Sequence, residues 1–354
     1  MNSAVIAMSG GVDSSVSAFL LQQAGYETRG VMFSMCGAFR TEDGMQQQKD
    51  IADARAVAES LQIPFEVLDL SDAFRQRVMQ FFAGSYIRGE TPNPCVECNR
   101  TVKFPYLVQY ADETGGGIIA TGHYARTQRD PGTGRTLLLK ARAAAKDQSD
   151  VLYNLPQQTL SRLVFPLGEY EKSQVRAIAE EHRLLNFRKS DSQDICFIPD
   201  GDYARFISDF SSYDSAPGDF VSEDGMVLGR HRGLIHYTTG QRRGLGVSAD
   251  RPLYVLRKDL QRNQVVLGGS SALFAKSVRV AQTHYIPFDR LTGPLRVQAK
   301  IRYSQQTAPA VLEPTGDREA ALIFDEPQRA PTAGQSAVFY DGNVVIGGGV
   351  IVCT

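Results

Sequence analysis

Short apolar runs alternate with amphipathic stretches along the first half of the chain. Apolar runs predict strands at Ala4–Met8, Arg29–Ser34 and residues 65–70, and a fourth strand within residues 115–124. Helical periodicity follows Gly11 as far as Gly25 and recurs at Asp50–Gln62, Asp72–Ile87, Glu171–Arg183 and Asp202–Phe210, with Ser71 as a candidate N-cap. Strands that alternate with helices indicate an α/β fold with a parallel sheet.

The pattern changes near Ser211. Beyond it, short β-like runs are separated by Gly and Pro, which predicts two small β-rich modules that meet near Ser271. We therefore expect three domains: residues 1–210 as the α/β catalytic domain, residues 211–270 as a central β-rich domain, and residues 271–354 as a C-terminal β domain.

Length and composition agree with a multidomain globular protein. A chain of 354 residues exceeds one comfortable core, and no run of about 18 apolar residues predicts a membrane span. The N-terminal stretch lacks the basic flank of a signal peptide. Five cysteines without a secretion signal favour a reducing cytoplasm, where thiols serve chemistry or metals. With a net charge of −1, nucleic-acid binding requires local basic patches, such as the one between Met226 and Arg262.

A glycine-rich turn, MSGGVDSS at residues 8–15, joins the first strand to the first helix. Its glycines let backbone N–H groups converge on an anion, and Ser14 and Ser15 add hydroxyls at the positive end of the helix. The turn lacks the lysine of a Walker A loop and does not fit G-x-G-x-x-G. An ordinary capped turn is the bland alternative, but its place between strand and helix favours a phosphate-binding site.

Two cysteines lie in the stretch TPNPCVECNR, where Cys95 and Cys98 follow Pro92 and Pro94. They are candidates for metal ligands, a redox pair or a nucleophile with a helper, and buried packing is the structural alternative. Cys98 directly precedes the expected helix NRTVKF, and a helix N-terminus favours the thiolate.

These motifs carry a family resemblance. SGGVDSS resembles the pyrophosphate loop of ATP pyrophosphatases, which adenylate a substrate. Longer segments resemble tRNA-specific 2-thiouridylases from end to end and in the same order: TPNPCVECNRTVKF, ATGHYAR, KDQSDVLYNL, SQDICFIP, GRHRGLIHYTTGQRRGLG, KIRYSQ and AGQSAVFYDG. That family thiolates the wobble uridine of certain tRNAs. It has a pyrophosphatase domain, a small central β-rich domain and a C-terminal β-barrel.

The resemblance implies roles for individual residues. ATP, with Mg²⁺, would be bound by Ala7, Met8, Ser9, Gly10, Gly11, Val12, Asp13, Ser14, Met32 and Gly122. Cys98 would be the nucleophile, and Cys196 would carry or resolve a persulfide. The positions that match tRNA contacts are His123, Lys146, Asp147, Gln148, Arg302, Tyr303 and Gln335. The partners would be a tRNA with a wobble uridine and a sulfur donor, which is a cysteine desulfurase, a sulfur relay protein or hydrosulfide.

One position departs from a common form of the family, which has aspartate where this chain has Cys95. Cys95, Cys98 and Cys196 could bind three irons of a [4Fe–4S] cluster and leave the fourth iron open for hydrosulfide. Alternatively, Cys95 is a neutral replacement, and Cys98 and Cys196 work by persulfide. A structural zinc site is disfavoured because no fourth ligand is evident. Both sulfur routes remain open, and Cys36 and Cys353 are expected to be structural.

Two rival functions remain. Another ATP pyrophosphatase, such as an amidating synthetase, would act on a small molecule and would not need the cysteines. A non-catalytic RNA-binding protein with a relic nucleotide fold would bind tRNA without releasing AMP or pyrophosphate. The intact Ser9–Ser14 stretch argues against the second, and tRNA 2-thiolation is the function that the sequence predicts.

Overall fold

The computed structural model describes residues 3–35, 41–184, 195–303 and 305–353. The chain divides by its contacts into two compact units. Unit 1 consists of Met1–Met79, Cys95–Pro199 and Asn343–Ile346, and unit 2 consists of Gln80–Pro94, Asp200–Gly342 and Gly347–Thr354. Each unit is described by itself.

The sheet of unit 1 is parallel throughout its described strands, as the apolar runs predict. Its order is β3-β2-β1-β4-β7. The strands are β1 (Ser3–Ala7), β2 (Glu27–Ser34), β3 (Phe65–Asp69), β4 (Ile118–Thr121) and β7 (Leu163–Val164). Because β2 and β4 flank β1, the chain leaves β1 toward one side of the sheet and later returns on the other. The carboxyl end of β1 is therefore a topological switch point, where such sheets bind ligands.

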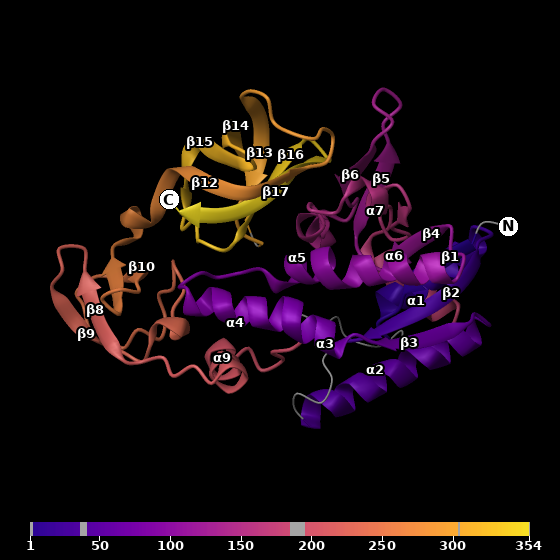
Figure 1. Cartoon of the computed structure of the whole chain (residues 1–354), viewed down its shortest axis with the longest axis horizontal. Helices are drawn as coiled ribbons and strands as arrows, with labels where there is room; N and C mark the ends of the chain where they lie inside the picture. The colour runs from indigo at the N-terminus through magenta and orange to yellow at the C-terminus, as the bar shows by residue number, and fades with distance from the viewer. Residues whose placement is uncertain (1–2, 36–40, 185–194, 304, 354) are drawn as a thin grey trace. The chain divides into compact units, whose positions relative to one another are not determined.

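Helices α1 (Val12–Gln23) and α2 (Thr41–Ser60) share one apolar core with the sheet (Figure 1). In that core, Ala18 and Leu21 of α1 and Val57 of α2 pack against Ile6 of β1. Helix α8 (Lys172–Glu181) packs against α1 through Val175 and Ala179. Helix α6 (Phe104–Glu113) contacts β1 and β4. Among the described residues, no helix is both long enough and apolar enough to cross a bilayer.

The expected elements are found, with two corrections. Helix α2 begins nine residues before the expected Asp50, because a polar N-terminal part precedes its apolar face. Ser71 is not an N-cap but the first residue of α3 (Ser71–Phe74), and its N–H donates to Asp69 Oδ1 at 2.9 Å. The helical run continues through a π-helical turn, η2 (Arg75–Met79), into α4 (Gln80–Ile87).

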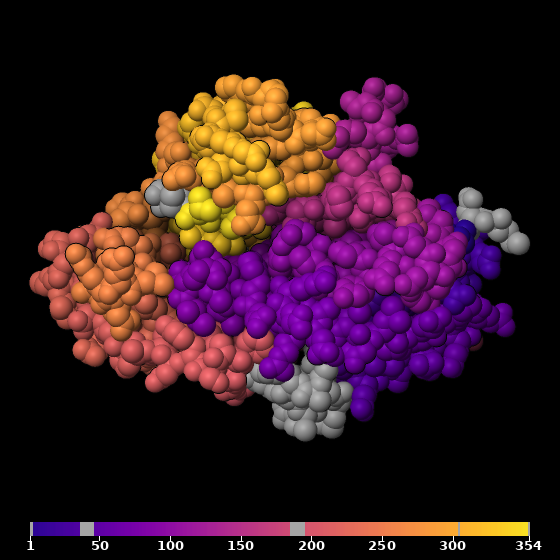
Figure 2. Space-filling view, viewed as in Figure 1, coloured from indigo at the N-terminus to yellow at the C-terminus, as the bar shows by residue number. Residues whose placement is uncertain are grey.

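A hairpin of β5 (Ala125–Arg129) and β6 (Thr136–Lys140) was not predicted. It projects from unit 1 as a narrow knob in Figure 2. Its exposed tip, DPGTGR, has the Pro and Gly residues of a turn, so the signal was present in the sequence.

Unit 2 contains a small central sheet with the order β10-β11-β8-β9. The strands are β8 (Gly218–Ser222), β9 (Val227–His231), β10 (Tyr254–Asp259) and β11 (Gln264–Gly268). Its core contains Phe220, Tyr237, Val255 and Val265. Helix α9 (Tyr203–Ser211) precedes the sheet, and Asp202 caps it by accepting from the Arg205 N–H at 3.0 Å.

The C-terminal strands of unit 2 close into a barrel. Over the described residues its order is β12-β15-β14-β13-β16-β17, and β17 pairs back to β12. The strands are β12 (Phe274–Tyr285), β13 (Leu295–Lys300), β14 (Ala308–Gly316), β15 (Glu319–Arg329), β16 (Ser336–Asp341) and β17 (Val344–Cys353). The expected fold class, an α/β catalytic part followed by a β-rich module and a β-barrel, is confirmed.

Barrel closure depends on glycine in β17. Gly347 has a φ of +154°, and a Cβ there would lie 2.0 Å from the His284 carbonyl oxygen of β12. We expect Gly347→Ala to lower the free energy of unfolding by about 3 kcal/mol, because the two backbones must separate. Urea unfolding followed by circular dichroism measures the change.

Gly342 is the matched control. It has a φ of +56°, and an added methyl group would have no heavy atom of the described residues within 4 Å. Gly342→Ala should cost only the conformational strain of about 1 kcal/mol. Equal losses in the two variants would show that the close contact between β17 and β12 does not matter.

Candidate active site

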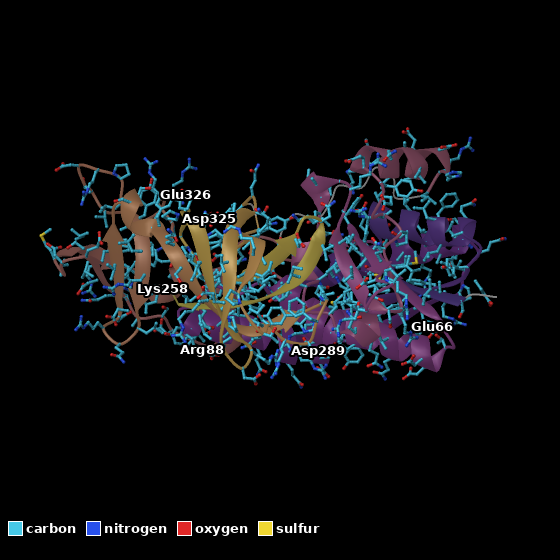
Figure 3. All side chains as sticks on the ribbon, turned by 90° about the horizontal axis from the view of Figure 1, so that it is seen from above. Glu66, Arg88, Lys258, Asp289, Asp325 and Glu326 are labelled. Carbon is cyan, nitrogen blue, oxygen red and sulfur yellow. The ribbon has the colours of Figure 1, made fainter. Side chains whose placement is uncertain are left out.

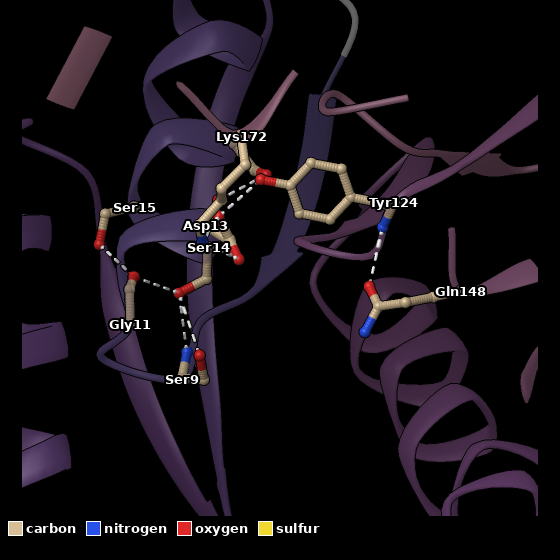
Figure 4. A network of polar contacts seen from close by, with 9 residues as sticks. Ser9, Gly11, Asp13, Ser14, Ser15, Tyr124, Gln148 and Lys172 are labelled. Carbon is tan, nitrogen blue, oxygen red and sulfur yellow. Dashed lines mark hydrogen bonds and ion pairs between the residues drawn. The ribbon is translucent and has the colours of Figure 1, made fainter. Parts of the chain in front are cut away.

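The loop after β1 has the geometry of an anion-binding turn. Gly10 has a φ of +69°, and a Cβ there would lie 2.4 Å from the Asp50 carbonyl oxygen, so only glycine fits. The Ser14 hydroxyl accepts from the Ser9 N–H at 3.1 Å and donates to the Gly11 carbonyl at 3.1 Å (Figure 4). These bonds hold the turn beside the first N–H groups of α1, the end of a helix that attracts anions.

A second glycine brings β4 to the same place. Gly122 follows β4, and a Cβ at this position would lie 2.9 Å from the Ser14 backbone nitrogen. The structure thus brings the TGHY segment against the first turn of α1, although 108 positions separate Gly122 from Ser14 in the sequence. A methyl group here would intrude on the amide that an anion would use.

Other predicted nucleotide residues lie around this turn in different environments. Ala7 ends β1, and Met8 and Met32 are buried in the core under the sheet. Gly11 accepts from the Ser15 hydroxyl at 2.9 Å, and Val12 is buried against α8. The structure gathers Ser9, Gly10, Gly11, Asp13, Ser14 and Gly122 at the end of the sheet.

Asp13 is held by two partners that the sequence did not reveal. Lys172 Nζ lies 2.8 Å from Asp13 Oδ1 and 2.9 Å from Oδ2, and the Tyr124 hydroxyl donates to Oδ1 at 2.9 Å (Figure 4). A carboxylate in the first turn of α1 would otherwise repel an incoming phosphate. The Lys172 ammonium balances that charge, so the turn keeps its attraction for anions.

The KDQ segment, which was expected to touch tRNA, also organises the protein. Asp147 Oδ1 accepts from the Ala141 N–H at 2.9 Å, and its Oδ2 accepts from the Ser149 hydroxyl at 2.8 Å. Gln148 Oε1 accepts from the Tyr124 N–H at 2.9 Å. Lys146 ends a short 3₁₀ helix with its side chain exposed. Gln148 therefore fixes the position of Tyr124, and Asp147 joins Ala141 to Ser149.

His123 lies among aromatic rings. Its ring stacks on Phe104 at 6.0 Å between centroids, and its Nδ1 lies 2.8 Å from the Thr121 hydroxyl. Burial, with a smaller effect of Lys103, holds the pKa of His123 well below its usual value. A neutral His123 can exchange hydrogen bonds but offers no charge to a phosphate at neutral pH.

The cysteine segment is helical from an earlier point than expected. Helix α5 (Pro94–Cys98) runs directly into a π-helical turn, η3 (Asn99–Lys103), and then into α6. The expectation that Cys98 precedes a helix N-terminus is therefore wrong, since Cys98 already has helical φ and ψ angles of −59° and −48°. The helix dipole consequently gives its thiolate no special support.

Burial dominates the chemistry of Cys98, whose side chain is 8% exposed. Its Sγ lies 3.9 Å from Met35 Sδ. Burial raises the pKa of the Cys98 thiol to about 12, and Lys103 acts against this as the main stabilising charge. Lys103 was missed in the sequence; its signal was a lysine five residues after Cys98, the spacing that one π-helical turn makes adjacent.

The structure brings Cys95 and Cys196 near Cys98. Both are thiols with exposed surface, and Cys196 follows a segment that lies outside the described residues. Burial of the thiol is the main cause that raises the pKa of Cys95, and the charges of Cys196 and the buried Asp150 raise it too. Lys103 lowers it. Three groups from three segments therefore act on the Cys95 thiol. Cys36 lies outside the described residues.

The same cysteines were candidates for a [4Fe–4S] cluster. Among the residues that the structure describes, no three His, Cys, Asp or Glu side chains are arranged to hold a metal ion. The three cysteine sulfurs are close enough to interact electrostatically. The ligands of a [4Fe–4S] cluster bind different iron atoms and do not surround a single ion, so the cluster stays a prediction.

The remaining predicted tRNA residues belong to unit 2. Arg302 is used within it: Nε donates to the Ala330 carbonyl at 3.0 Å and Nη2 to the Thr239 carbonyl at 2.8 Å. Tyr303 is 67% exposed, with Lys300 Nζ 5.2 Å from its ring centroid. Gln335 donates from Nε2 to the Thr91 carbonyl at 2.7 Å. Of these side chains, Tyr303 is the one presented to solvent.

Comparisons with known proteins match the whole described architecture. Family models match residues 2–200 as a tRNA methyl transferase HUP domain, residues 205–269 as a tRNA methyl transferase PRC-barrel domain, and residues 275–351 as an aminomethyltransferase beta-barrel domain. A solved 4-thiouridine synthetase–RNA complex with bound ATP is similar over 60% of this chain and 52% of its own, with 16% identity and a TM-score of 0.39, too low to support an argument.

Two curated relatives cover nearly the full length. The tRNA-specific 2-thiouridylase MnmA of Clostridioides difficile strain 630 is 43% identical over 350 residues, which is 98% of this chain and 97% of the relative. The protein of the same name from Acetivibrio thermocellus is 44% identical over 352 residues, or 98% of each chain. At this identity and coverage, the chain belongs to the tRNA-specific 2-thiouridylase family.

Proposed function

We propose that this protein is a tRNA-uridine 2-sulfurtransferase, which adenylates the C2 oxygen of the wobble uridine with ATP and replaces it with sulfur. One observation carries the proposal: unit 1 contains both an anion-binding turn and a group of thiols. Within that group, the positive charge of Lys103 favours the thiolate forms of Cys95 and Cys98. Full-length similarity to 2-thiouridylases supports the same assignment.

The first half-reaction uses the turn at the end of β1. Backbone N–H groups of the first turn of α1 would hold the departing pyrophosphate, with Gly10 and Gly122 providing room. Mg²⁺ bound with ATP supplies charge neutralisation on the phosphates. Lys172 would keep Asp13 neutralised or release it toward the metal-bound nucleotide. Uridine C2 oxygen attacks the α-phosphate, and pyrophosphate leaves.

The second half-reaction replaces oxygen by sulfur. The terminal sulfur of a persulfide on Cys196 attacks C2, and AMP leaves with the former C2 oxygen. The Cys98 thiolate then attacks the Cys196 sulfur, which breaks the persulfide S–S bond, forms a Cys98–Cys196 disulfide and leaves sulfur on uridine. A cellular dithiol reductant restores both thiols. This route needs only the two cysteines and assigns Cys95 an auxiliary role.

The groups around the thiols determine whether Cys95 and Cys98 are protonated. Cys98 must lose a proton before it attacks, and its raised pKa keeps it protonated at rest. Lys103 stabilises the thiolate, while the buried Asp150 disfavours a charge on Cys95. The resting site is therefore protected from adventitious oxidation and is activated when the base arrives, since the base must leave its stack to enter.

Recognition of tRNA is proposed to use both units. His123, Lys146, Asp147 and Gln148 are the candidates in unit 1, and Arg302, Tyr303 and Gln335 are those in unit 2. Tyr303 beside Lys300 suits stacking on an unpaired base together with a phosphate contact. The proposed setting is the cytoplasm, with a cysteine desulfurase, a sulfur relay protein or hydrosulfide as sulfur donor. The three-part division at residues 210 and 270 remains part of this proposal.

The assignment is tested by measuring 2-thiouridine in digested tRNA by mass spectrometry, with ATP, Mg²⁺ and a sulfur source under anaerobic conditions. On the persulfide route we expect one AMP per thiolated uridine in iron-free protein. Cys98→Ser and Cys196→Ser should each abolish product. Activity only after iron–sulfur reconstitution would overturn the persulfide route, and failure of both forms would overturn thiolation itself.

The nucleotide turn is tested by Gly122→Ala. The added methyl group meets the Ser14 amide at 2.9 Å, so ATP affinity should fall about tenfold, or about 1.4 kcal/mol. Titration calorimetry with a non-hydrolysable ATP analogue measures this. Gly117→Ala is the control, because its Cβ would lie 3.4 Å from the nearest atom, the Ser3 carbonyl oxygen. If Gly117→Ala lowers ATP affinity to a similar extent, the effect of Gly122→Ala does not arise from the turn.

The role of Lys103 is tested by the pH dependence of Cys98 alkylation. With a pKa of about 12, the rate in the wild-type protein should still rise at pH 10 without a plateau. Lys103→Met removes the stabilising charge, raises the pKa further and should slow alkylation at pH 9 by about fivefold. Peptide mass spectrometry, with fragmentation between Cys95 and Cys98, gives the rate.

Arg100→Met is the matched control for Lys103. Arg100 lies on the same helical turn, but its guanidinium forms a bidentate pair with Glu97 at 2.7 Å and 2.9 Å. Its loss should leave the Cys98 rate within about twofold of the wild type. If both variants slow alkylation equally, a general loss of positive charge explains the result and Lys103 has no specific role.

A further inference from the structure

The cysteine segment is preceded by a stretch that belongs to the other unit. The chain leaves unit 1 after Met79, contributes Gln80–Pro94 to unit 2 and re-enters unit 1 at Cys95. This excursion consists of α4 and a connector, residues 88–93, and it ends at Pro94, the first residue of α5. The connector is therefore the covalent segment that joins unit 2 to the cysteine helix.

Aromatic packing holds α4 in unit 2. Phe82 is fully buried and contacts Tyr203 and Phe206 of α9, with ring centroids 6.2 Å and 6.0 Å away. Tyr86 stacks on Tyr203 at 6.3 Å. These contacts bury one face of α4 and set its position on α9.

The end of α4 is held by the central sheet. Lys258 of β10 places Nζ 5.9 Å from the Tyr86 ring centroid (Figure 3 labels Lys258 and Arg88). That ammonium is buried and has no hydrogen-bond partner within the described part of the chain. Burial lowers the Lys258 pKa to about 8, while Glu90 acts in the opposite sense. Gly89, with a φ of +79°, lies so close to Leu260 that a Cβ would come within 2.8 Å of it.

Two hydrogen bonds with the segment between β15 and β16 hold the connector at Thr91. Thr91 donates its N–H to the Ala333 carbonyl at 2.8 Å, and its own carbonyl accepts from Gln335 Nε2 at 2.7 Å. Gly334, with a φ of +89°, allows this approach, because a Cβ there would lie 2.9 Å from the Thr91 nitrogen. Both backbone groups of one residue are thus bound, and one of the two bonds comes from a side chain.

A short segment with two prolines joins Thr91 to the cysteines. Pro92, Asn93 and Pro94 alone separate Thr91 from Cys95. Each proline fixes its own φ and restricts the residue before it, so the link has little freedom to absorb a displacement. Pro94 is also the first residue of α5, where its missing N–H costs nothing.

We propose that Gln335 is a positioning residue, which acts through the Thr91 carbonyl to hold the Cys95–Cys98 helix in its working place. The proposal deepens the proposed function and rests on it for the catalytic consequence, but the structural coupling stands apart from any activity. Gln335 was expected to touch tRNA. A side chain already bound to the connector transmits the state of the barrel to the cysteines.

The test uses Gln335→Met in the full-length protein, because methionine has a similar size and no charge but cannot donate. In the tRNA-free protein, release of the connector should expose Cys98 and speed its alkylation by iodoacetamide at least about threefold. In thiolation assays kcat should fall about tenfold. Thermal unfolding confirms that the variant is folded.

Gln328→Ala is the matched control. Gln328 is a half-buried glutamine of the same unit, and its amide bonds the Glu326 carbonyl and Gln305 instead of the connector. It should leave the alkylation rate and kcat unchanged. An unchanged Cys98 alkylation rate in Gln335→Met would overturn the proposal, and weaker tRNA binding with unchanged kcat would show that Gln335 serves only as an RNA contact. If wild-type protein lacks thiolation, the alkylation result still decides the coupling.

Discussion

The close backbone approach between β4 and the first turn of α1 is the constraint on which the site depends. Gly122 lies where any side chain would press on the Ser14 amide, and a side chain at Gly10 would come still closer to the Asp50 carbonyl oxygen. These contacts require glycine at both positions and leave backbone N–H groups at the open end of α1. The rest of the proposed nucleotide site, including the pairing of Asp13 with Lys172, is arranged around this point.

The proposed sulfur chemistry meets an opposing constraint, because burial disfavours the thiolate form of Cys98. Cys98 is nearly inaccessible and strongly protonated at rest, and Lys103 supplies the main local compensation. A buried, protonated thiol reacts slowly, and for the same reason it is protected from unwanted reactions. Reactivity then has to come from the arrival of substrate and sulfur, which joins catalysis to the order of binding.

Local sequence patterns were sufficient for much of the fold. The strand, turn and helix around Ser9–Ser14 follow from neighbouring residues, and so do the change to β structure after Ser211 and the capped helix at Asp202. The partners of Asp13 could not be predicted, because Lys172 lies 159 positions away. The error at Cys98 had a different origin: Pro94 at the first helical position is a start signal for α5, whereas the helix was expected only from Asn99.

The π-helical turn at Asn99–Lys103 has a further consequence. A π turn accommodates one more residue than an α-helical turn of the same height, so it is equivalent to an insertion within an otherwise regular helix. A second such turn, Arg75–Met79, is joined to it by the bond from Arg77 Nη1 to the Thr101 carbonyl at 2.7 Å. Because the π turn absorbs the extra residue, α5 and α6 keep nearly the relative direction that they would have in a regular helix one residue shorter. Deleting Thr101 would restore regular winding and leave Cys98 in nearly the same direction relative to α6, so the turn can gain or lose one residue without turning the sulfur away.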